Sequence, residues 1–295
     1  MRVFVTGSSS HLAATLLPLL CDRKDVERVT GIDLAAPVFR HPKFHAAQLD
    51  IRSPRLEPLM EGHDALVHLA FVVLRGKMPE REMFDVNVAG SHKAFHAARR
   101  AGLKRLIHMS SAAVYGGGVH VREEAPLNPP SGFLYAQHNA HLEKLLAIEF
   151  PECVRLRPHL ILGPHAQPLL KQLLGLRCYA RLPDPQPLLQ CVHEQDVARA
   201  VLLALQREAR GAFNLAVEEN FSFREIVRSR HRFAVPLPLF AARAGAGAAW
   251  RLSGWGGEPA WVEGLTRTLL LNCRRAAVEL GWCTTRDAEA ALAQT

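Results

Sequence analysis

Short runs of apolar, often β-branched residues recur along most of the chain, and segments with helical spacing separate them. These runs predict strands at Val3–Thr6, Arg28–Asp33, Phe44–Leu49, Ala65–Ala70, Arg105–Ser110, Val154–Leu162, Leu189–Val192 and Ala212–Ala216. Helices are predicted at about 11–21, 80–101, 133–150, 194–208, 222–230 and 272–280. Apolar strands that alternate with helices are typical of a parallel sheet covered on both faces. Right-handed crossovers then give an α/β fold, a Rossmann-type doubly wound parallel sheet.

The regular alternation weakens after residue 166, where prolines become frequent and the helical segments are isolated. We therefore predict two structural units. Residues 1–165 and 189–216 form the Rossmann domain, and residues 166–188 and 217–295 form a smaller C-terminal substrate cap.

Composition and charge narrow the class of protein. Of the 295 residues, 48% are hydrophobic and 22% charged, as in ordinary globular proteins. The net charge is +8, but the basic residues are scattered, so we expect a small anionic molecule rather than a nucleic acid as the partner. Six dispersed cysteines without a C-x-x-C pair favour reduced thiols in the cytoplasm. We expect no secretion signal and no membrane span, because the chain opens on a strand and the apolar stretch Phe233–Trp250 contains two prolines and Arg243.

The turn after the first predicted strand matches a nucleotide-binding turn in part. Gly7 occupies the first position of a G-x-x-G-x-x-G pattern, whereas Ser10 and Ala13 stand at its other two glycine positions. Such a turn lets backbone N–H groups at a helix N-terminus meet a pyrophosphate. Taken alone, the segment is equally well interpreted as a serine-rich turn that caps a helix.

Residues at the ends of the following strands favour the nucleotide interpretation. Asp33 ends the second strand, where a carboxylate accepts hydrogen bonds from ribose hydroxyls and repels a 2′-phosphate. Asp50 and Ile51 follow the third strand, where an adenine ring would lie, and residues 68–70 close the fourth strand beside the pyrophosphate. These spacings predict NAD as the cofactor and disfavour NADP.

With these motifs in place, the chain resembles the extended short-chain dehydrogenase/reductases, the NAD-dependent epimerase/dehydratase family, over nearly its whole length. The matching segments are TGSSSHLA at 6–13, Asp33, HLA at 68–70, NVAG at 87–90, SSAAVYG at 110–116, Tyr135, LRP at 156–158, LGP at 162–164, VHEQDVA at 192–198, FNL at 213–215 and ELGW at 279–282. The resemblance and the strand ends together imply a set of cofactor-binding residues. These are Gly7, Ser10, His11, Leu12, Asp33, Asp50, Ile51, His68, Leu69, Ala70, Asn87, Ser110, Tyr135, Asn139 and Pro158.

The resemblance also implies a catalytic serine or threonine, a tyrosine and a lysine. Ser111 and Tyr135 match the first two, and the tyrosinate would take a proton from a substrate hydroxyl, or return one, as hydride moves to or from nicotinamide. Asn139 stands in place of the lysine. It can hydrogen-bond a ribose but carries no charge, and a nearby cation typically lowers the pKa of a phenol by about 1–3 units. General-base help of roughly 10²–10⁴-fold is therefore at risk.

Two other residues of the same predicted helix carry a charge or can acquire one. Lys144 lies half a turn out of phase with Tyr135, so it faces the opposite side of the helix. His138 is closer in angle and would supply a charge when protonated, although we expect it to be an exposed helical histidine.

Several substrate signals of the family are missing. Ala112 and Ala113 stand where dehydratases carry an acidic pair, so sugar dehydration is not expected. Leu160 and Leu189 stand where nucleotide-sugar epimerases usually carry an asparagine and a phosphate-binding arginine, which weakens the nucleotide-sugar interpretation. Other arginines of the predicted cap remain available for a phosphate, namely Arg177, Arg181 and Arg251.

The sequence leaves two functions open. The first is an oxidoreductase or epimerase that acts on a sugar, a nucleotide sugar or another small alcohol or ketone through Ser111 and Tyr135. The second is an NAD-binding regulatory or sensory protein that has kept the fold and lost catalysis, which Asn139 and Ser10 favour. A scaffold with an empty pocket is a minor form of the second.

The predicted helices at 80–101 and 133–150 bear on assembly and on metal binding. Such helices pair across subunits in the family, which implies a homodimer. His92 and His96 lie four residues apart on the first helix, so both could face one metal ion. Because no third ligand is apparent nearby in the sequence, we interpret them as part of a solvated helix face and expect no metal site.

Overall fold

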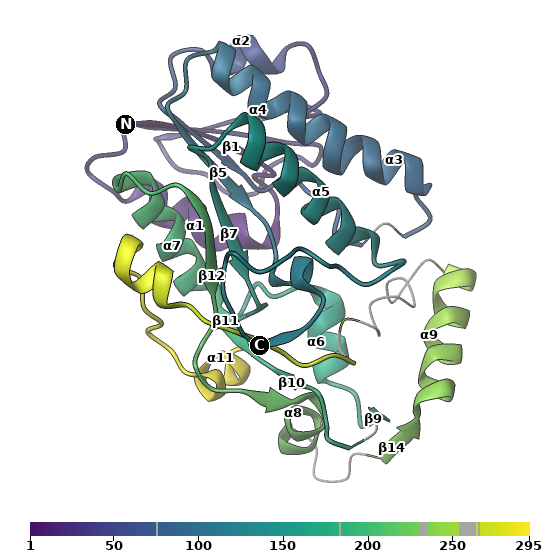
Figure 1. Cartoon of the computed structure of the whole chain (residues 1–295). Helices are drawn as coiled ribbons and strands as arrows, with labels where there is room; N and C mark the ends of the chain where they lie inside the picture. Colours follow the sequence, from purple (N-terminus) through teal and green to yellow (C-terminus); the bar gives the residue numbers. More distant parts are fainter. Residues whose placement is uncertain (75, 183, 231–234, 254–263, 265) are drawn as a thin grey trace.

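A seven-stranded parallel sheet forms the centre of the computed structural model, which describes residues 1–74, 76–182, 184–230, 235–253, 264 and 266–295 (Figure 1). The strand order is β12-β7-β5-β4-β1-β2-β3. The strands are β1 (Arg2–Thr6), β2 (Arg28–Asp33), β3 (Phe44–Gln48), β4 (Ala65–His68), β5 (Arg105–Met109), β7 (Val154–Pro158) and β12 (Gly211–Leu215). The predicted Rossmann-type sheet is therefore confirmed.

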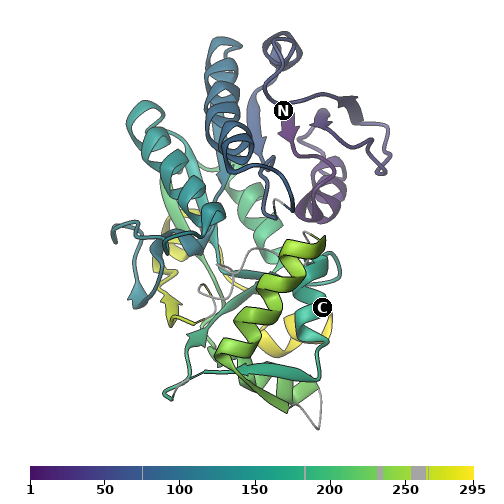
Figure 2. The same ribbon diagram turned by 90° about the vertical axis from the view of Figure 1, so that its right-hand side faces the viewer.

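Helices cover both faces of this sheet (Figures 1 and 2). Helices α1 (His11–Cys21) and α7 (Glu194–Gln206) pack on one face, and α2 (Leu56–Met60), α4 (Ser91–Arg100) and α5 (Leu134–Glu149) pack on the other. Successive side chains of a strand point to opposite faces. Accordingly, Val3 and Val5 join the core beneath α1 and α7, whereas Phe4 joins the core beneath α4 and α5.

The strand order reverses between β1 and β4. The chain builds outward from β1 to β3, returns to β4 on the other side of β1, and then continues outward to β12. Thr6 is paired with His68, so β1 and β4 end level with each other. Ligands of open α/β sheets bind in the crevice outside the carboxyl ends of the strands at such a reversal.

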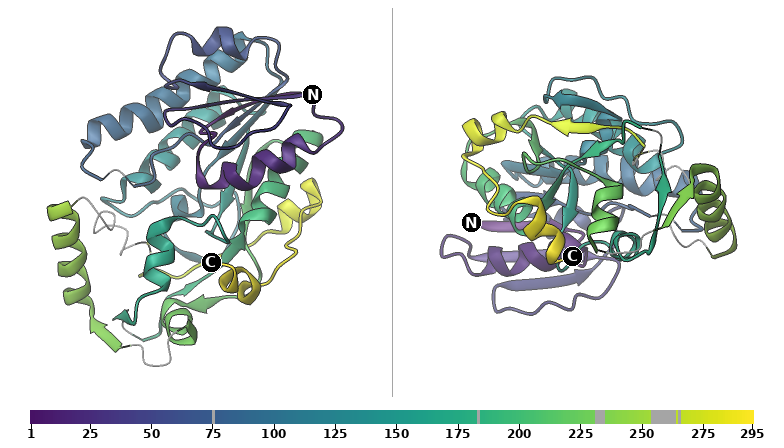
Figure 3. Two further views of the ribbon diagram at one scale, coloured as in Figure 1. Left: turned by 180° about the vertical axis from the view of Figure 1, so that it is seen from behind. Right: turned by 90° about the horizontal axis from the view of Figure 1, so that it is seen from below.

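Most of the remaining elements gather at one end of the molecule, below the sheet in Figure 1 and in the left-hand view of Figure 3. Four two-stranded sheets pair β10 (Leu188–Leu189) with β13 (Phe221–Ser222), β11 (Cys191–His193) with β8 (Leu160–Leu162), β14 (Val235–Pro238) with β9 (Cys178–Arg181), and β15 (Leu269–Leu271) with β6 (Gly118–Val121). The helices here are α6 (Pro168–Leu174), α8 (Phe223–Arg230), α9 (Leu239–Ser253) and α11 (Ala288–Ala293).

Two predicted strands are divided in the structure. The run 154–162 forms β7 in the main sheet and then β8, which pairs with β11 instead. Pro158 ends β7 because a proline has no N–H to donate to a ladder. The run 189–192 is shared between β10 and β11, which belong to different small sheets. Of the segment 189–216, only β12 therefore contributes to the main sheet.

The predicted helices also differ in part. The helix predicted at 80–101 consists of α3 (Glu80–Phe84), a π-helical stretch η1 (Asp85–Gly90) and α4. The one at 272–280 contains the π-helical stretch η3 (Ala276–Leu280). Helix α9 was not predicted, because its alanines and glycines give no clear apolar face. Within the described ranges, every helix falls short of the length and hydropathy that crossing a bilayer requires.

Candidate active site

Gly7 makes the tight turn at the end of β1. Its φ is +73°, and a Cβ added there would lie 2.5 Å from the backbone nitrogen of Ala70. The N–H groups of Gly7 and Ser8 both donate to the carbonyl oxygen of Ile32, at 2.9 and 3.1 Å. The first glycine of the motif is therefore required by backbone conformation and by the close approach of the segment after β4.

Ser10 serves as the N-cap of α1. Its backbone is extended, with φ −70° and ψ 161°, and its hydroxyl oxygen accepts from the N–H of Ala13 at 3.3 Å. A side chain at this position is therefore unstrained. The first N–H groups of a helix have no carbonyl partner in that helix, so His11 and Leu12 present free donors and the positive end of the helix dipole. The structure thus shows a capped helix, and the free N–H groups of the same turn are compatible with the predicted binding of a pyrophosphate.

Asp33 lies half-buried at the end of β2 with its carboxylate held by backbone groups. Oδ2 accepts from the N–H of Ser9 at 2.9 Å, and Oδ1 accepts from the N–H of Ala35 at 3.0 Å. A carboxylate oxygen can accept more than one hydrogen bond, so both oxygens keep capacity for ribose hydroxyls. The helix N–H groups and this carboxylate together form a donor and acceptor set that fits a pyrophosphate and an adjacent ribose.

The predicted adenine-side residues are tied into the protein. Asp50 forms an ion pair with Arg52 at 2.7 Å, and this guanidinium lowers the pKa of the Asp50 carboxyl. Arg52 also binds Asp85 at 2.8 Å. Ile51 is buried in the core beneath α4. The Asp50 carboxylate is therefore engaged before any ligand arrives.

His68 and Asn87 hold the segment after β4 in place. The His68 ring is buried, with one nitrogen 2.8 Å from Thr6 Oγ1 and the other 2.8 Å from Ser91 Oγ. Burial lowers its pKa well below the usual range, so the ring is neutral. Asn87 accepts from the N–H of Val72 at 2.7 Å and donates to its carbonyl oxygen at 2.9 Å. The polar atoms of His68 and Asn87 are therefore occupied by hydrogen bonds within the protein. The backbone of Leu69 and Ala70 lies against Gly7.

Ser111, Tyr135 and Asn139 are brought together where β5 ends and α5 begins. Ser111 caps the short helix η2 (Ala112–Tyr115), and its hydroxyl oxygen accepts from the N–H of Ala113 at 3.2 Å. The Tyr135 ring packs edge-on against Phe71, with ring centres 5.8 Å apart. Burial raises the pKa of Tyr135, and the Ser111 and Asn139 side chains beside the phenol lower it by less.

Asn139 is buried one helical turn after Tyr135. Its Nδ2 donates to the backbone oxygen of Tyr135 at 3.0 Å. Its Oδ1 is buried and has no partner within hydrogen-bond geometry among the residues that the structure describes, although the Asn139 side chain lies close enough to the buried His108 ring to act on the pKa of that ring. An unsatisfied buried acceptor costs about 1–3 kcal/mol. A hydroxyl donor from a bound ribose would relieve this cost, which is a second respect in which the site fits a dinucleotide.

The other candidate cations do not act on Tyr135. The expectation that His138 is exposed was wrong: it is 6% exposed, and its ring centre lies 5.4 Å from that of Phe84. Burial lowers the pKa of His138 to about 4, so the ring is neutral near pH 7. Lys144 is exposed. In the described part of the chain, no charged side chain shifts the pKa of Tyr135.

A buried ionic network lies beneath the site. The Glu143 carboxylate, 1% exposed, accepts from the Ser110 hydroxyl at 2.5 Å and from Arg157 Nε at 2.9 Å. Arg157 also donates to the Tyr115 hydroxyl at 2.5 Å, and that hydroxyl donates to Asn214 at 2.7 Å. The network ties α5 to β7 and to Ser110, which follows β5. It therefore holds in place the backbone that carries the neighbouring Ser111. The sequence reasoning missed it, although a glutamate between the apolar residues of α5 and an arginine inside β7 were the available signals.

Positions at which the resemblance predicted polar substrate contacts hold apolar side chains. Ala112 and Leu189 are buried, at 1% and 2% exposed, and Leu189 belongs to a hydrophobic cluster with Leu162 and Phe221. Pro158 is buried and lies in register with Leu215. His159, which follows it, has its pKa lowered to about 4 by burial, and its Nε2 lies 3.1 Å from the carbonyl oxygen of Leu269. Because His159 is neutral near pH 7 and the other side chains of this group are apolar, none of these described positions carries a charge.

The fold and this site define a Rossmann-type protein of the dinucleotide-binding class. The model of the NAD dependent epimerase/dehydratase family matches residues 3–216, and the chain belongs to that family. The predicted family and NAD as its cofactor are thereby confirmed.

Known proteins resemble the chain in sequence and in structure. It is 29% identical over 267 residues to a UDP-glucose 4-epimerase of Azospirillum brasilense, covering 77% of this chain and 76% of that protein. It is 27% identical over 263 residues to the sterol demethylase protein B of Methylococcus capsulatus, covering 80% and 78%. Among solved structures, MoeE5 in complex with UDP-glucuronic acid and NAD gives a TM-score of 0.80 at 22% identity over 100% of this chain and 97% of that one. The UDP-glucose 4-epimerase of Thermotoga maritima gives 0.78 at 18% identity, with the same coverage.

Proposed function

We propose that the protein binds NAD(H) between the N-terminus of α1 and Asp33 and interconverts a hydroxyl and a carbonyl group through Ser111 and Tyr135. The observation that carries this proposal is the cluster of Ser111, Tyr135 and Asn139 at the carboxyl end of β5, with the Asn139 Oδ1 acceptor unsatisfied. NAD, when bound, accepts or supplies a hydride. The protein supplies the hydrogen bonds and the proton.

Each residue has a distinct task in this proposal. The Tyr135 hydroxyl donates a proton to the oxygen of a carbonyl substrate, and the Tyr135 tyrosinate removes one from an alcohol in the reverse direction. Ser111 holds the same oxygen by a hydrogen bond. Asn139 accepts from a hydroxyl of the nicotinamide ribose and so orients it, whereas the family's lysine would donate to the ribose. Unlike a lysine, Asn139 does not stabilise a tyrosinate. Catalysis of alcohol oxidation at neutral pH is therefore weakened, while the protonated phenol stays competent to donate.

The substrate that we propose is a sugar, a nucleotide sugar or another small alcohol or ketone. The apolar positions Leu160 and Leu189 favour a substrate that is not held there by a diphosphate clamp. The cap arginines Arg177, Arg181 and Arg251 are exposed, so none of them is buried in a preformed phosphate site. The named relatives include a protein called an epimerase of UDP-glucose and one called a sterol demethylase, so they leave the substrate open.

Binding and turnover experiments test this function. Calorimetry with NAD⁺, NADH, NADP⁺ and NADPH should show that the forms without the 2′-phosphate bind more tightly. Tighter binding of the phosphorylated forms would contradict the role of Asp33, and no binding of any form would refute the proposed site. A panel of sugars, nucleotide sugars and ketones should then reveal NAD-dependent turnover that Tyr135→Phe abolishes.

The neutral surroundings of Tyr135 also favour a second candidate, an NAD-binding regulatory or sensory protein without catalysis. It becomes the better account if NAD binds and no member of the panel reacts, even at high pH where the phenol ionises. We further propose that the protein works in the cytoplasm, where a reducing environment suits its six free cysteines.

A homodimer through α4 and α5 completes the proposal. Ile148 on α5 is 79% exposed and Phe84 on α3 is 40% exposed, so apolar side chains are present on the outer surface of this layer. Sedimentation should therefore give twice the mass of one 32.6 kDa chain. A mass near that of one chain would refute the dimer.

A further inference from the structure

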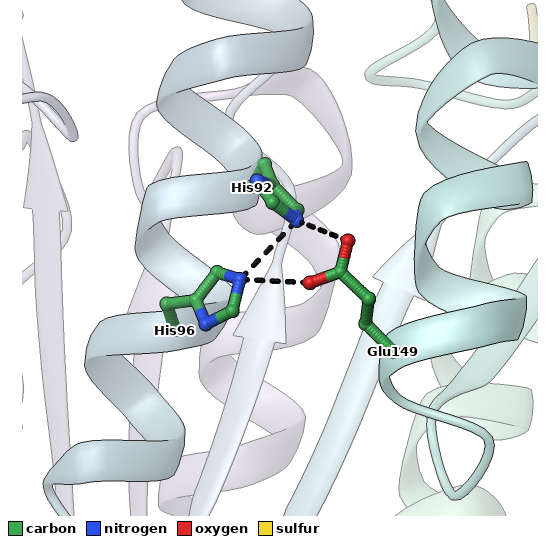
Figure 4. Close-up of side chains that lie close together, drawn as sticks. All are labelled: His92, His96 and Glu149. Atoms are coloured by element: carbon green, nitrogen blue, oxygen red, sulfur yellow. Dashed lines mark hydrogen bonds and ion pairs between the residues drawn. The ribbon is translucent and has the colours of Figure 1, made fainter.

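Two histidines and a glutamate converge on the outer side of the helical layer (Figure 4). His92 and His96 lie one turn apart on α4, and Glu149 is the last residue of α5. The two Nε2 atoms are 3.2 Å apart. His92 Nε2 lies 3.0 Å from Glu149 Oε1, and His96 Nε2 lies 3.0 Å from Glu149 Oε2. The sequence shows no third ligand near these histidines, but the packing of α5 against α4 brings Glu149 to them from 57 residues beyond His92 and 53 beyond His96.

Hydrogen bonds cannot satisfy all three contacts at once. Each Nε2 atom either carries one hydrogen and donates, or carries none and accepts. If both donate to the carboxylate, neither can accept from the other across 3.2 Å. If one accepts from the other, its lone pair faces the carboxylate oxygen. A single cation removes this conflict, because it takes one lone pair from each of the three ligands.

The spacing of the three groups suits a transition-metal ion. In tetrahedral zinc sites with metal–ligand distances of about 2.0–2.1 Å, neighbouring ligand atoms lie about 3.3 Å apart. Here the two Nε2 atoms are 3.2 Å apart, and each lies 3.0 Å from a different oxygen of Glu149. One ligand atom from each residue can therefore be chosen so that all three lie within 4.8 Å of one another. In a single chain the side chains of His92, His96 and Glu149 are 27%, 35% and 33% exposed, so an ion can reach them and keep water as a further ligand. In the proposed homodimer through α4 and α5, the same cluster would lie at or beside the interface between the subunits.

We propose that His92, His96 and Glu149 form a binding site for a divalent transition-metal ion of the Zn²⁺ type, which fastens α4 to the end of α5. The backbone at Glu149 is already held, since Arg99 donates to its carbonyl oxygen at 2.5 Å and stacks over Phe150 at 3.7 Å. Along α5, Glu149 lies about 21 Å from Tyr135, given a rise of about 1.5 Å per residue. The site is therefore structural and separate from the hydride chemistry, and it does not depend on the proposed catalysis.

Zn²⁺ titration of the metal-free full-length protein tests the proposal. Calorimetry should detect binding in the wild type, and His96→Ala should weaken it by at least about tenfold, in line with the loss of one direct ligand. His141→Ala removes an exposed histidine of α5 outside the cluster and should leave the affinity unchanged. Zn²⁺ should also raise the melting temperature of the wild type and of His141→Ala, but not that of His96→Ala.

Two further measurements keep the test decisive. If His96→Ala does not fold, Glu149→Gln replaces it, because the amide keeps the shape of the carboxylate and loses its charge. Co²⁺ should give visible absorption bands of nitrogen and oxygen ligands, without the thiolate bands that binding at Cys283 would produce. Absence of Zn²⁺ binding to the wild type, or equal affinity in wild type and the two cluster variants, would overturn the proposal.

Discussion

Replacing Asn139 with lysine tests the electrostatic argument about Tyr135 most sharply. Position 139 lies one helical turn after Tyr135 on the same face, and the Asn139 amide already reaches the Tyr135 backbone oxygen at 3.0 Å. An ammonium group there should lower the pKa of the phenol by about 1–3 units. That is about 1.4–4 kcal/mol in favour of the tyrosinate.

The sign of the effect differs between the two reaction directions. Alcohol oxidation needs the tyrosinate, and burial raises the pKa of Tyr135. Because the ordinary pKa of a tyrosine is about 10, fewer than about one wild-type molecule in a thousand is ionised at pH 7. The kcat/KM for oxidation should therefore rise about tenfold per pH unit up to at least about pH 10. Carbonyl reduction needs the phenol, so its kcat/KM should stay flat over this range.

In Asn139→Lys, oxidation at pH 7 should be about 10–1,000-fold faster than in the wild type and should level off at lower pH. Reduction should begin to fall at that same lower pH. Asn139→Met is the matched control, because it has a similar length and no charge, and Tyr135→Phe should abolish both directions in every background. The reasoning fails if wild-type oxidation is already independent of pH near pH 7, or if the methionine variant gains as much as the lysine variant.

Three further changes follow from the same structure. Asp33→Asn should improve NADP⁺ binding relative to NAD⁺ by about tenfold, as one 2′-phosphate repulsion is removed; an unchanged ratio in calorimetry would contradict the role of Asp33. Arg157→Met should lower the free energy of unfolding by about 1.5–3 kcal/mol, because the buried Glu143 carboxylate loses its closest cation and keeps only Ser110 and the more distant Arg155, at 3.5 Å; urea unfolding would show this, and a loss below about 1 kcal/mol, the scale of a surface pair, would count against the network. His108 is fully buried, and its pKa is lowered to about 3, chiefly by burial. The unfolded chain protonates His108 near pH 6.5, whereas the folded chain does so only near pH 3. The free energy of unfolding should therefore fall by up to about 1.4 kcal/mol per pH unit as the pH drops from 6.5 towards 3. In His108→Gln this fall should be less steep.

The sequence predicted the elements whose periodicity is strong. The strands that form the main sheet, the position of Gly7 and the place of Asp33 at the end of β2 follow from apolar runs and from turn chemistry. The small sheets were not predictable in the same way. Pairs such as β8 with β11 contain only three residues each, so their apolar runs carry no information about which partner they choose.

Side-chain partners depend on packing between elements that are distant in sequence. The sequence identifies Ser111, Tyr135 and the loss of the lysine at Asn139, but not that His138 is buried by Phe84. Likewise, Glu143 is recognised as part of a network only when β7 places Arg157 beside it. Such contacts are fixed by how α5 docks on the sheet, and no spacing within a single helix encodes them.

A crystal structure of the protein with NAD⁺ tests the central claim most directly. The account predicts the pyrophosphate at the N–H groups of His11 and Leu12, a ribose on Asp33, and a nicotinamide ribose hydroxyl that donates to Asn139 Oδ1. It also predicts the Tyr135 hydroxyl beside the nicotinamide ring. A cofactor bound elsewhere, or one that leaves both Asp33 and Asn139 without a contact, would contradict it.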